Sequence, residues 1–244
     1  MATFVLVHGA YHGAWCWAAV IGTLERMGHR ALALDLPGHG ASSFKRADVT
    51  LQVYADGLVD FVEQADVREL VLVAHSMGGL PMTMAAPRLA SRLKRMIFVD
   101  ALVLRDGERA ADLIPPARAR LLEGALTGPD RCLPVSPEFI DLFRRNFIQD
   151  GAPALQDFVI AALQPQPLAA YLEAADNRAF FELKVPTDYV ALSEDLAQFP
   201  RKWHPFYSCR LRNPTVSTIQ SGHEVMFTKP IELAQTLVAL ARQS

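Results

Sequence analysis

The chain has 244 residues, of which 51% are hydrophobic and 20% are charged, and its formal net charge is -2 at pH 7. This length suits one α/β domain with an excursion, and it allows a sizeable core without disulfides or metal ions. The nearly balanced charge, without a long run of one sign, argues against nucleic acid or a membrane surface as partner. We therefore expect a small-molecule ligand.

The cysteines and the apolar segments bear on the cellular compartment of the protein. Cys16, Cys132 and Cys209 lie far apart without a Cys-x-x-Cys pair, which suits a reducing compartment and offers no metal-ligand spacing. No basic and apolar leader precedes the first predicted strand, and no segment is apolar over the length that a bilayer requires. We expect a cytoplasmic protein, and the sequence leaves monomer and homodimer open.

Short apolar runs alternate along the chain with stretches of helical period, which predicts an α/β fold with a mainly parallel sheet covered on both faces. The expected strands are Thr3–His8, Arg30–Asp35, Glu69–Ala74, Arg95–Asp100, Thr187–Ser193 and Thr215–Gln220. The expected helices are Trp15–Met27, Leu51–Gln64, Met77–Leu93, Leu196–Trp203 and Ile231–Arg242. Thr50 is a candidate N-cap, and Pro87 is expected to shorten or bend its helix.

The alternation lapses between Ala101 and Val185, where the sequence is helical with frequent prolines. We predict an inserted helical cap over residues 101–185 on an α/β core formed by residues 1–100 and 186–244, together one compact unit. Ser136-Pro137 predicts a helix start. The apolar stripe of Phe139, Leu142 and Phe143 after it is interpreted as packing between cap and core.

The segment Val71–Gly79 combines an apolar strand with a serine between small residues. A strand that turns within one residue into a helix holds the turning residue in strained geometry, so the positions two before and two after it need small side chains. Those positions are Ala74 and Gly78. The order of strand, turn and helix predicts a nucleophile elbow at Ser76, although glycine is usual at the first of the two positions.

A serine hydroxyl needs a base to accept its proton as it attacks. His223 follows the last predicted strand, at the carboxyl edge of the sheet where reacting groups gather, and an imidazole can take and return a proton at neutral pH. The acid that orients this base should follow the preceding strand. Asp195 fits that position better than Glu194 or Asp188, while Asp100, after an earlier strand, is the reserve candidate.

Attack on a carbonyl places negative charge on its oxygen, which two backbone N–H groups can stabilise. We expect one donor from Met77 and the other from Ala10, in the glycine-rich loop after the first strand. His8 and His12 are interpreted as structural or pocket-lining residues, and His12 with Trp15 are the substrate-binding candidates. No carboxylate or cysteine cluster accompanies the two histidines, so we predict no metal and no cofactor. The loop also lacks the lysine and the third glycine of phosphate-binding motifs.

The chain resembles the α/β-hydrolase superfamily over most of its core, in particular the branch of plant methylesterases, hydroxynitrile lyases and small bacterial esterases. The resemblance rests on the elbow and on Leu6–Trp17, Asp35–Gly40, Gly222-His223 and Lys229-Pro230. It implies the triad Ser76, Asp195 and His223 and oxyanion donors at Ala10 and Met77, in agreement with the residue-by-residue interpretation. The cap, which sets substrate choice in this branch, matches weakly.

Two departures bear on the reaction. Hydroxynitrile lyases of this branch carry a lysine directly after the catalytic histidine, to stabilise departing cyanide, and a threonine directly after the first histidine of the oxyanion loop. This chain has Glu224 and Gly9 there. A carboxylate at position 224 would oppose a developing anion, which disfavours the lyase alternative.

We therefore predict a serine hydrolase that cleaves a small carboxylic ester, a methyl ester or a carbamate ester, through an acyl-enzyme. Two alternatives stay open at this point. One is a hydroxynitrile lyase, and the other is a non-catalytic small-molecule receptor that kept the fold.

Overall fold

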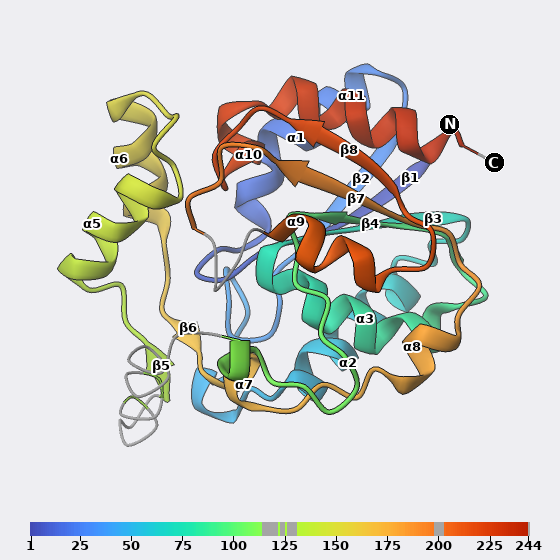
Figure 1. The fold of residues 1–244 in the computed structure, drawn as a ribbon, viewed down its shortest axis with the longest axis horizontal. Helices are drawn as coiled ribbons and strands as arrows, with labels where there is room; N and C mark the ends of the chain where they lie inside the picture. The colour runs from blue at the N-terminus through green and yellow to red at the C-terminus, as the bar shows by residue number, and fades with distance from the viewer. Residues whose placement is uncertain (114–121, 123–124, 126–130, 198–202, 244) are drawn as a thin grey trace.

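The computed structural model describes residues 1–113, 122, 125, 131–197 and 203–243 (Figure 1). The predicted strands form one six-stranded sheet within the described residues, in the order β2-β1-β3-β4-β7-β8, and every pairing in it is parallel. The strands are β1 (Thr3–Val7), β2 (Arg30–Leu34), β3 (Leu70–His75), β4 (Leu93–Val99), β7 (Thr187–Leu192) and β8 (Thr215–Ile219). The predicted parallel α/β fold is confirmed.

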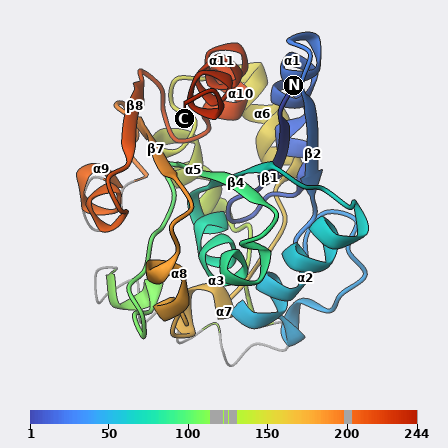
Figure 2. The ribbon, with the colours of Figure 1, turned by 90° about the vertical axis from the view of Figure 1, so that its right-hand side faces the viewer.

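The central strands are apolar on both faces because helices cover the sheet above and below. In β1, Phe4 and Leu6 face one buried cluster while Val5 and Val7 face the other, as the two-residue period of a strand requires. Figure 2 shows α1 (Ala18–Arg26) and α11 (Pro230–Ala241) over one face and α2 (Leu51–Gln64), α3 (Gly79–Leu89) and α8 (Arg178–Glu182) over the other. This sandwich fixes the carboxyl ends of the strands along one edge of the sheet.

Among the covering helices, α1, α2, α3 and α11 correspond to predicted helices, whereas α10 (Val225–Thr228) was not predicted. Those over the first face are α1 (Ala18–Arg26), preceded by the 3-10 helix η1 (Ala14–Trp17), α10 (Val225–Thr228) and α11 (Pro230–Ala241). Those over the second are α2 (Leu51–Gln64), α3 (Gly79–Leu89) and α8 (Arg178–Glu182). Thr50 caps α2 as predicted, since its side-chain oxygen accepts a hydrogen bond from the N–H of Val53 at 3.0 Å.

Two predicted helix boundaries were wrong. The helix after the elbow ends at Leu89 rather than Leu93, two residues after the proline within it, Pro87, and the chain enters β4 at Leu93. The helix predicted over 196–203 falls mostly on residues 198–202, outside the described residues. Leu196 and Ala197 are not helical, and the short α9 begins at Trp203 and ends at Phe206.

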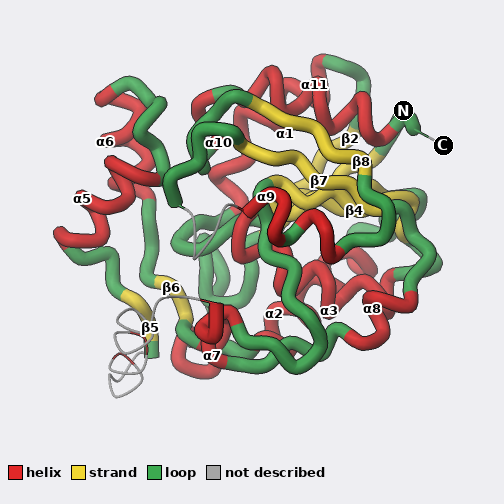
Figure 3. The backbone as a smooth tube through the Cα atoms, viewed as in Figure 1, coloured by secondary structure: helices red, strands yellow, loops and turns green. Residues whose placement is uncertain are grey.

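The chain between β4 and β7 forms two groups of elements (Figure 3). The helices α5 (Pro137–Asn146) and α6 (Pro153–Ala162) stand beyond the carboxyl edge of the sheet (Figure 1). Below them lie α7 (Ala169–Leu172) and α8, whose Ala170 and Phe180 join the same buried cluster as α2 and α3.

Short elements complete the structure: the antiparallel pair β5 (Cys132–Leu133) and β6 (Gln166–Pro167), and the 3-10 helices η2 (Arg46–Asp48), η3 (Ser76–Gly78), η4 (Ala110–Leu113) and η5 (Ser208–Arg210). Within the part of the chain that the structure describes, no helix has the length and apolar character to cross a membrane.

Candidate active site

The strand β3 ends at His75, and Ser76 adopts a backbone φ of +53° before the chain turns through η3 into α3. A side chain is rarely held in this left-handed region without a constraint. The Ser76 carbonyl accepts a hydrogen bond from the N–H of Leu102 at 3.0 Å. A Cβ on Gly78 would lie 2.6 Å from the carbonyl oxygen of His8, so glycine is required there, whereas Ala74 fits into the core.

His223 stands between Ser76 and Asp195. Its Nε2 lies 3.0 Å from Ser76 Oγ, and its Nδ1 lies 2.8 Å from Asp195 Oδ2. Because a carboxylate oxygen accepts, Nδ1 carries the hydrogen and Nε2 is free to accept from the serine hydroxyl. Ser76 is 9% exposed, and His223 and Asp195 are each 1% exposed. The structure therefore brings the three predicted residues together in a buried hydrogen-bonded chain.

The other acids near the strand before His223 have different partners. Asp188 lies within β7 and forms a buried ion pair with Arg95, at 2.6 Å. Glu194 accepts a hydrogen bond from the side-chain amide of Gln220 at 2.7 Å. Asp195 combines two tasks, because its Oδ1 also accepts from the N–H of Ala197 at 2.6 Å. It therefore both holds the following turn and orients the imidazole.

Asp100, the reserve candidate, lies at the same corner. One oxygen of its carboxyl group lies within 4.8 Å of both a carboxylate oxygen of Asp195 and a ring nitrogen of His223. Burial, reinforced by the neighbouring Asp195, raises the pKa of Asp100 well above its usual value. These three groups are spaced as metal ligands can be, but the imidazole and Asp195 are hydrogen-bonded to each other. We describe the cluster as an acid–base site.

The electrostatics around His223 favour its role as a base. Burial lowers the pKa of His223, but the charge and hydrogen bond of Asp195 outweigh it, so the pKa is raised overall. Behind it, His75 donates from Nε2 to the backbone carbonyl of His223, with a separation of 3.0 Å. Burial lowers the pKa of His75 well below its usual value, so this neighbour is neutral and supports the loop without adding charge.

The inserted segment also positions the loop that carries His223. The carboxylate of Asp150 accepts from the N–H of Gly222 at 2.9 Å and from the hydroxyl of Ser221 at 3.0 Å. The carbonyl of Phe147 accepts from the N–H of Glu224 at 3.1 Å, and the Phe147 ring meets the imidazole edge to face. Sequence analysis missed both residues, because their roles depend on contacts between distant segments.

The proposed oxyanion donors, Ala10 and Met77, both line the cavity at Ser76. The loop of Ala10 is held by the inserted segment, since Gln166 accepts from the N–H of Tyr11 at 3.0 Å. Gly9 allows the loop to approach the elbow, because a Cβ there would lie 3.0 Å from both His75 Nδ1 and Ser76 Cβ. The close approach explains a glycine at this position.

The two histidines of this loop have different surroundings. The Nδ1 of His8 donates to the carbonyl of Gly9 at 2.8 Å, and its Nε2 accepts from the N–H of Leu36 at 3.1 Å. His8 is therefore structural. His12 lines the cavity, whereas Trp15 is absent from the described lining and stacks on the His12 ring instead. The structure thus gives no direct contact between Trp15 and the cavity.

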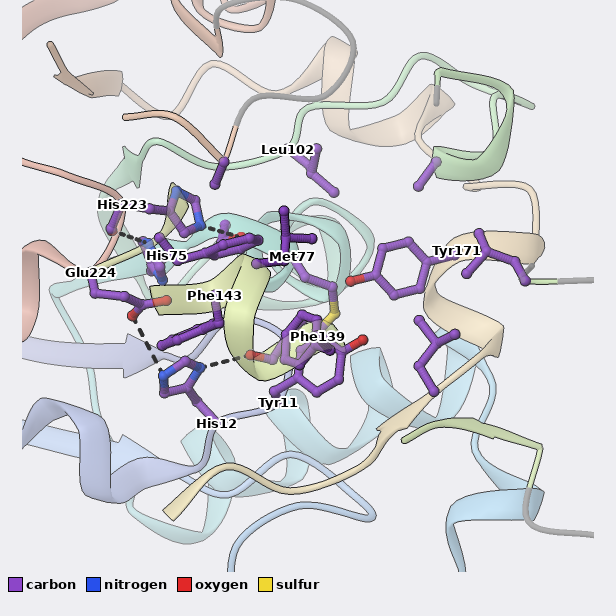
Figure 4. A pocket seen from close by; sticks show the side chains of 18 of the residues that line it. Tyr11, His12, His75, Met77, Leu102, Phe139, Phe143, Tyr171, His223 and Glu224 are labelled. Atoms are coloured by element: carbon purple, nitrogen blue, oxygen red, sulfur yellow. Dashed lines mark hydrogen bonds and ion pairs between the residues drawn. The ribbon is translucent and has the colours of Figure 1, made fainter. Parts of the chain in front are cut away.

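A cavity of about 440 Å³ opens over Ser76, and most of its lining is apolar (Figure 4). Phe139, Leu142 and Phe143 line it from α5. Our interpretation of this stripe as packing alone was therefore wrong: Phe139 stacks on Tyr11 at 4.1 Å between ring centroids, and both rings face the cavity. The helical period of a sequence predicts which residues share a face of the helix, but not whether that face packs against protein or lines a cavity.

Glu224 also lines the cavity, beside His223. Burial raises the pKa of Glu224 to about 8, which favours the protonated form of its carboxyl group at pH 7. The sequence-based argument that a negative charge at 224 opposes a lyase therefore does not hold at neutral pH. Among the described residues, the lining includes no lysine or arginine.

Comparison with known proteins identifies the family of the chain. The model of the Alpha/beta hydrolase family matches residues 4–236. The chain belongs to the alpha/beta hydrolase family. A carbendazim hydrolyzing esterase from Nocardioides sp. (strain SG-4G) is 31% identical over 252 residues, which cover 98% of this chain and 100% of the relative. Methylesterase 7 of Arabidopsis thaliana is 28% identical, with 98% and 95% coverage.

A solved structure resembles this alpha/beta hydrolase in fold over its whole length. An extracellular alpha/beta-hydrolase from a Paenibacillus species, described as homologous in structure and function to tobacco salicylic acid binding protein 2, gives a TM-score of 0.91. It is 27% identical, and the match covers 100% of both chains. The family and its relatives named as esterases support an enzyme that hydrolyses carboxylic esters.

Proposed function

We propose that the protein hydrolyses a small carboxylic ester, a methyl ester or carbamate ester with an apolar or aromatic acyl part, through an acyl-enzyme on Ser76. The observation that carries the proposal is the hydrogen-bonded chain from Ser76 Oγ through His223 to Asp195, at 3.0 Å and 2.8 Å. It opens into an apolar cavity large enough for an aromatic acyl group.

The proposed reaction has two steps. Ser76 Oγ attacks the carbonyl carbon as His223 Nε2 takes its proton, and the proton then passes to the alkoxy oxygen as the C–O bond breaks and the alcohol leaves. In the second step His223 takes a proton from water, the hydroxide oxygen attacks the acyl carbon, and the proton returns to Ser76 as the acid is released. The N–H groups of Ala10 and Met77 would stabilise the oxyanion in both steps.

The names of the relatives support this class of substrate, but they do not identify the substrate of this chain. One is described as hydrolysing carbendazim and others as methylesterases, and a carbamate carbonyl presents the same oxyanion as an ester. A cytoplasmic location, a monomer or homodimer, and independence from metal and cofactor stay predictions of the sequence.

The proposal is tested by measuring turnover of short-chain and aromatic methyl esters and methyl carbamates by the wild type and Ser76→Ala. We expect turnover by the wild type, with a burst of released alcohol equal to the enzyme concentration when deacylation is slow, and loss of at least about 10³-fold in the variant. Equal turnover by both proteins would reject the proposal. Stoichiometric binding without alcohol release would favour a receptor, and cyanide release from mandelonitrile a lyase.

A further inference from the structure

His12 offers the cavity a hydrogen-bond acceptor. Its Nδ1 lies 2.7 Å from the backbone carbonyl oxygen of Ala10. Because a carbonyl only accepts, Nδ1 carries the hydrogen, and Nε2 of the neutral ring keeps a lone pair. Burial lowers the pKa of His12 to about 3, so the ring stays neutral at neutral pH.

The carboxyl group of Glu224 meets that lone pair. Glu224 Oε2 lies 3.5 Å from His12 Nε2, and the two side chains are 2% exposed each. Neither atom has a hydrogen-bond partner among the described residues. A carboxylate would turn a negative oxygen toward a lone pair, whereas a carboxylic acid can donate its hydrogen to it. The geometry therefore fits a protonated Glu224.

The groups around Glu224 support the neutral acid. Burial has the largest effect on the pKa of Glu224, His223 lowers it, and Asp195 and Asp150 raise it, to about 8 overall. Cys16 of η1 interacts electrostatically with this carboxyl group, and burial raises the pKa of its thiol, so it adds no charge. The titratable neighbours are thus His12, Cys16, Asp150, Asp195 and His223.

A hydrogen directed at His12 would sit on Oε2 of Glu224, which leaves Oε1 as an oxygen that can only accept. Figure 4 shows this oxygen turned toward the cavity, at the end where His223 lies, while Tyr171 lies at the far end. Glu224 follows the proposed base directly in the chain, and His12 is two residues from the proposed oxyanion donor Ala10. The acceptor therefore lies at the end of the cavity where His223 contacts Ser76.

We propose that Glu224, oriented by His12, selects esters with a hydrogen-bond donor at the atom next to the reacting carbonyl. In an α-hydroxy ester this atom is a carbon that carries a hydroxyl group, and in a carbamate it is a nitrogen that carries a hydrogen. The rest of the lining is mainly apolar, so such a donor would lose its hydrogen bonds to water without this acceptor. The inference rests on the proposed function, whose substrate class it narrows.

The proposed selectivity is tested with three methyl esters that differ only at the atom between the phenyl ring and the reacting carbonyl. Methyl phenylacetate has a methylene next to the carbonyl, methyl N-phenylcarbamate has an N–H there, and methyl mandelate adds a hydroxyl to the methylene. For each protein the measured quantity is kcat/KM for a donor ester divided by kcat/KM for methyl phenylacetate. Comparing this ratio between variants cancels the intrinsic reactivities of the esters.

The variants are Glu224→Leu, which removes the acceptor, and Glu224→Gln, which imitates the protonated acid. The glutamine amide can donate to His12 Nε2 and offer its carbonyl oxygen to the substrate. We expect both ratios to fall about tenfold in E224L and to stay within about threefold of the wild type in E224Q. An unchanged ratio in E224L overturns the inference, and so does an equal fall in E224Q, since that result requires a carboxylate.

A binding measurement separates this inference from the proposed function. Wild type, E224L and E224Q are titrated by calorimetry with 1-hydroxy-1-phenylpropan-2-one and with 1-phenylpropan-2-one, which lacks the hydroxyl. We expect the preference for the hydroxyketone to be lost only in E224L, even if no ester is turned over. Equal preference in all three proteins overturns the inference while ester turnover stands. Thermal unfolding checks that each variant is folded, and E224M replaces E224L if leucine is not tolerated.

Discussion

Asp100 directly follows β4, Asp195 lies three residues beyond the end of the neighbouring strand β7, and the two buried carboxyl groups meet behind His223. Two carboxylates at this distance in a buried site cannot both be ionised without a large cost. Burial and the charge of Asp195 raise the pKa of Asp100 well above its usual value. The raised pKa favours the protonated form of Asp100, which can donate to Asp195 while Asp195 accepts from the imidazole.

Substitution of Asp100 tests this arrangement. Asp100→Asn keeps a hydrogen-bond donor beside Asp195, so kcat should stay within about threefold of the wild type, whereas Asp100→Ala should lower kcat about tenfold or more. The acid limb of the pH profile of kcat/KM gives a second readout. A neutral Asp100 does not raise the pKa of His223, so D100N should leave this limb in place.

The exposed Asp176 provides the control, since D176N should change neither kcat nor the pH profile. A shift of the acid limb to lower pH in D100N would mean that Asp100 is ionised in the active enzyme. That result would contradict the shared proton.

Gly9→Ala should disturb the elbow without unfolding the protein. The added Cβ would lie 3.0 Å from His75 Nδ1 and from Ser76 Cβ, which is tighter than most such contacts, so the loop or the serine has to give by a few tenths of an ångström. A displacement of a few tenths of an ångström in a catalytic group should lower kcat/KM by about tenfold to a hundredfold. The measurement is steady-state hydrolysis of a methyl ester.

Gly22→Ala is a matched control, because the nearest atom to the added Cβ is the end of the Arg26 side chain at 3.5 Å. It lies within α1, where alanine favours the helix by about 0.5 to 1 kcal/mol over glycine. We expect full activity and a slightly higher melting temperature. Equal activity losses in G9A and G22A would contradict the role of close approach at Gly9.

Sequence reasoning predicted the sheet and the elements that carry Ser76, His223 and Asp195 because these features are local. An apolar run, a turn and a helical period each lie within a short segment, and parallel strands bring their carboxyl ends to one edge. Sequence reasoning could not predict that Phe147 and Asp150 hold the loop of His223 or that Phe139 lines the cavity. It also could not predict the raised pKa of Glu224. Each depends on which distant segment packs against it and on how much water is excluded.

The aromatic lining from α5 should set affinity more than reaction rate. Phe139 faces the cavity and stacks on Tyr11, so Phe139→Ala removes apolar contacts from the acyl part of the substrate but touches no proposed catalytic residue. We expect KM for aromatic methyl esters to rise about tenfold, with kcat within about threefold. Phe158→Ala serves as control, because this ring on α6 is 63% exposed. A loss confined to kcat in F139A would contradict a role in binding.

The buried acid at 224 should make stability depend on pH in a direction that can be checked. Burial raises the pKa of Glu224 to about 8 from its ordinary value of 4.5. The folded state therefore holds a proton that the unfolded state releases above pH 4.5. The stabilisation is complete below pH 4.5 and is lost as the pH rises through about 8.

Glu224→Gln removes this titration and keeps the neutral shape. Relative to the wild type, the free energy of unfolding of E224Q should therefore increase between pH 4.5 and pH 8, by up to roughly 4 kcal/mol, and level off above it. Urea unfolding at pH 5, 6.5 and 8.5 measures the difference. Glu63→Gln, at an exposed position on α2, should show no such trend. Parallel stability curves for E224Q and the wild type would mean that Glu224 is ionised in the folded protein, because only a group with an unshifted pKa leaves the slope unchanged.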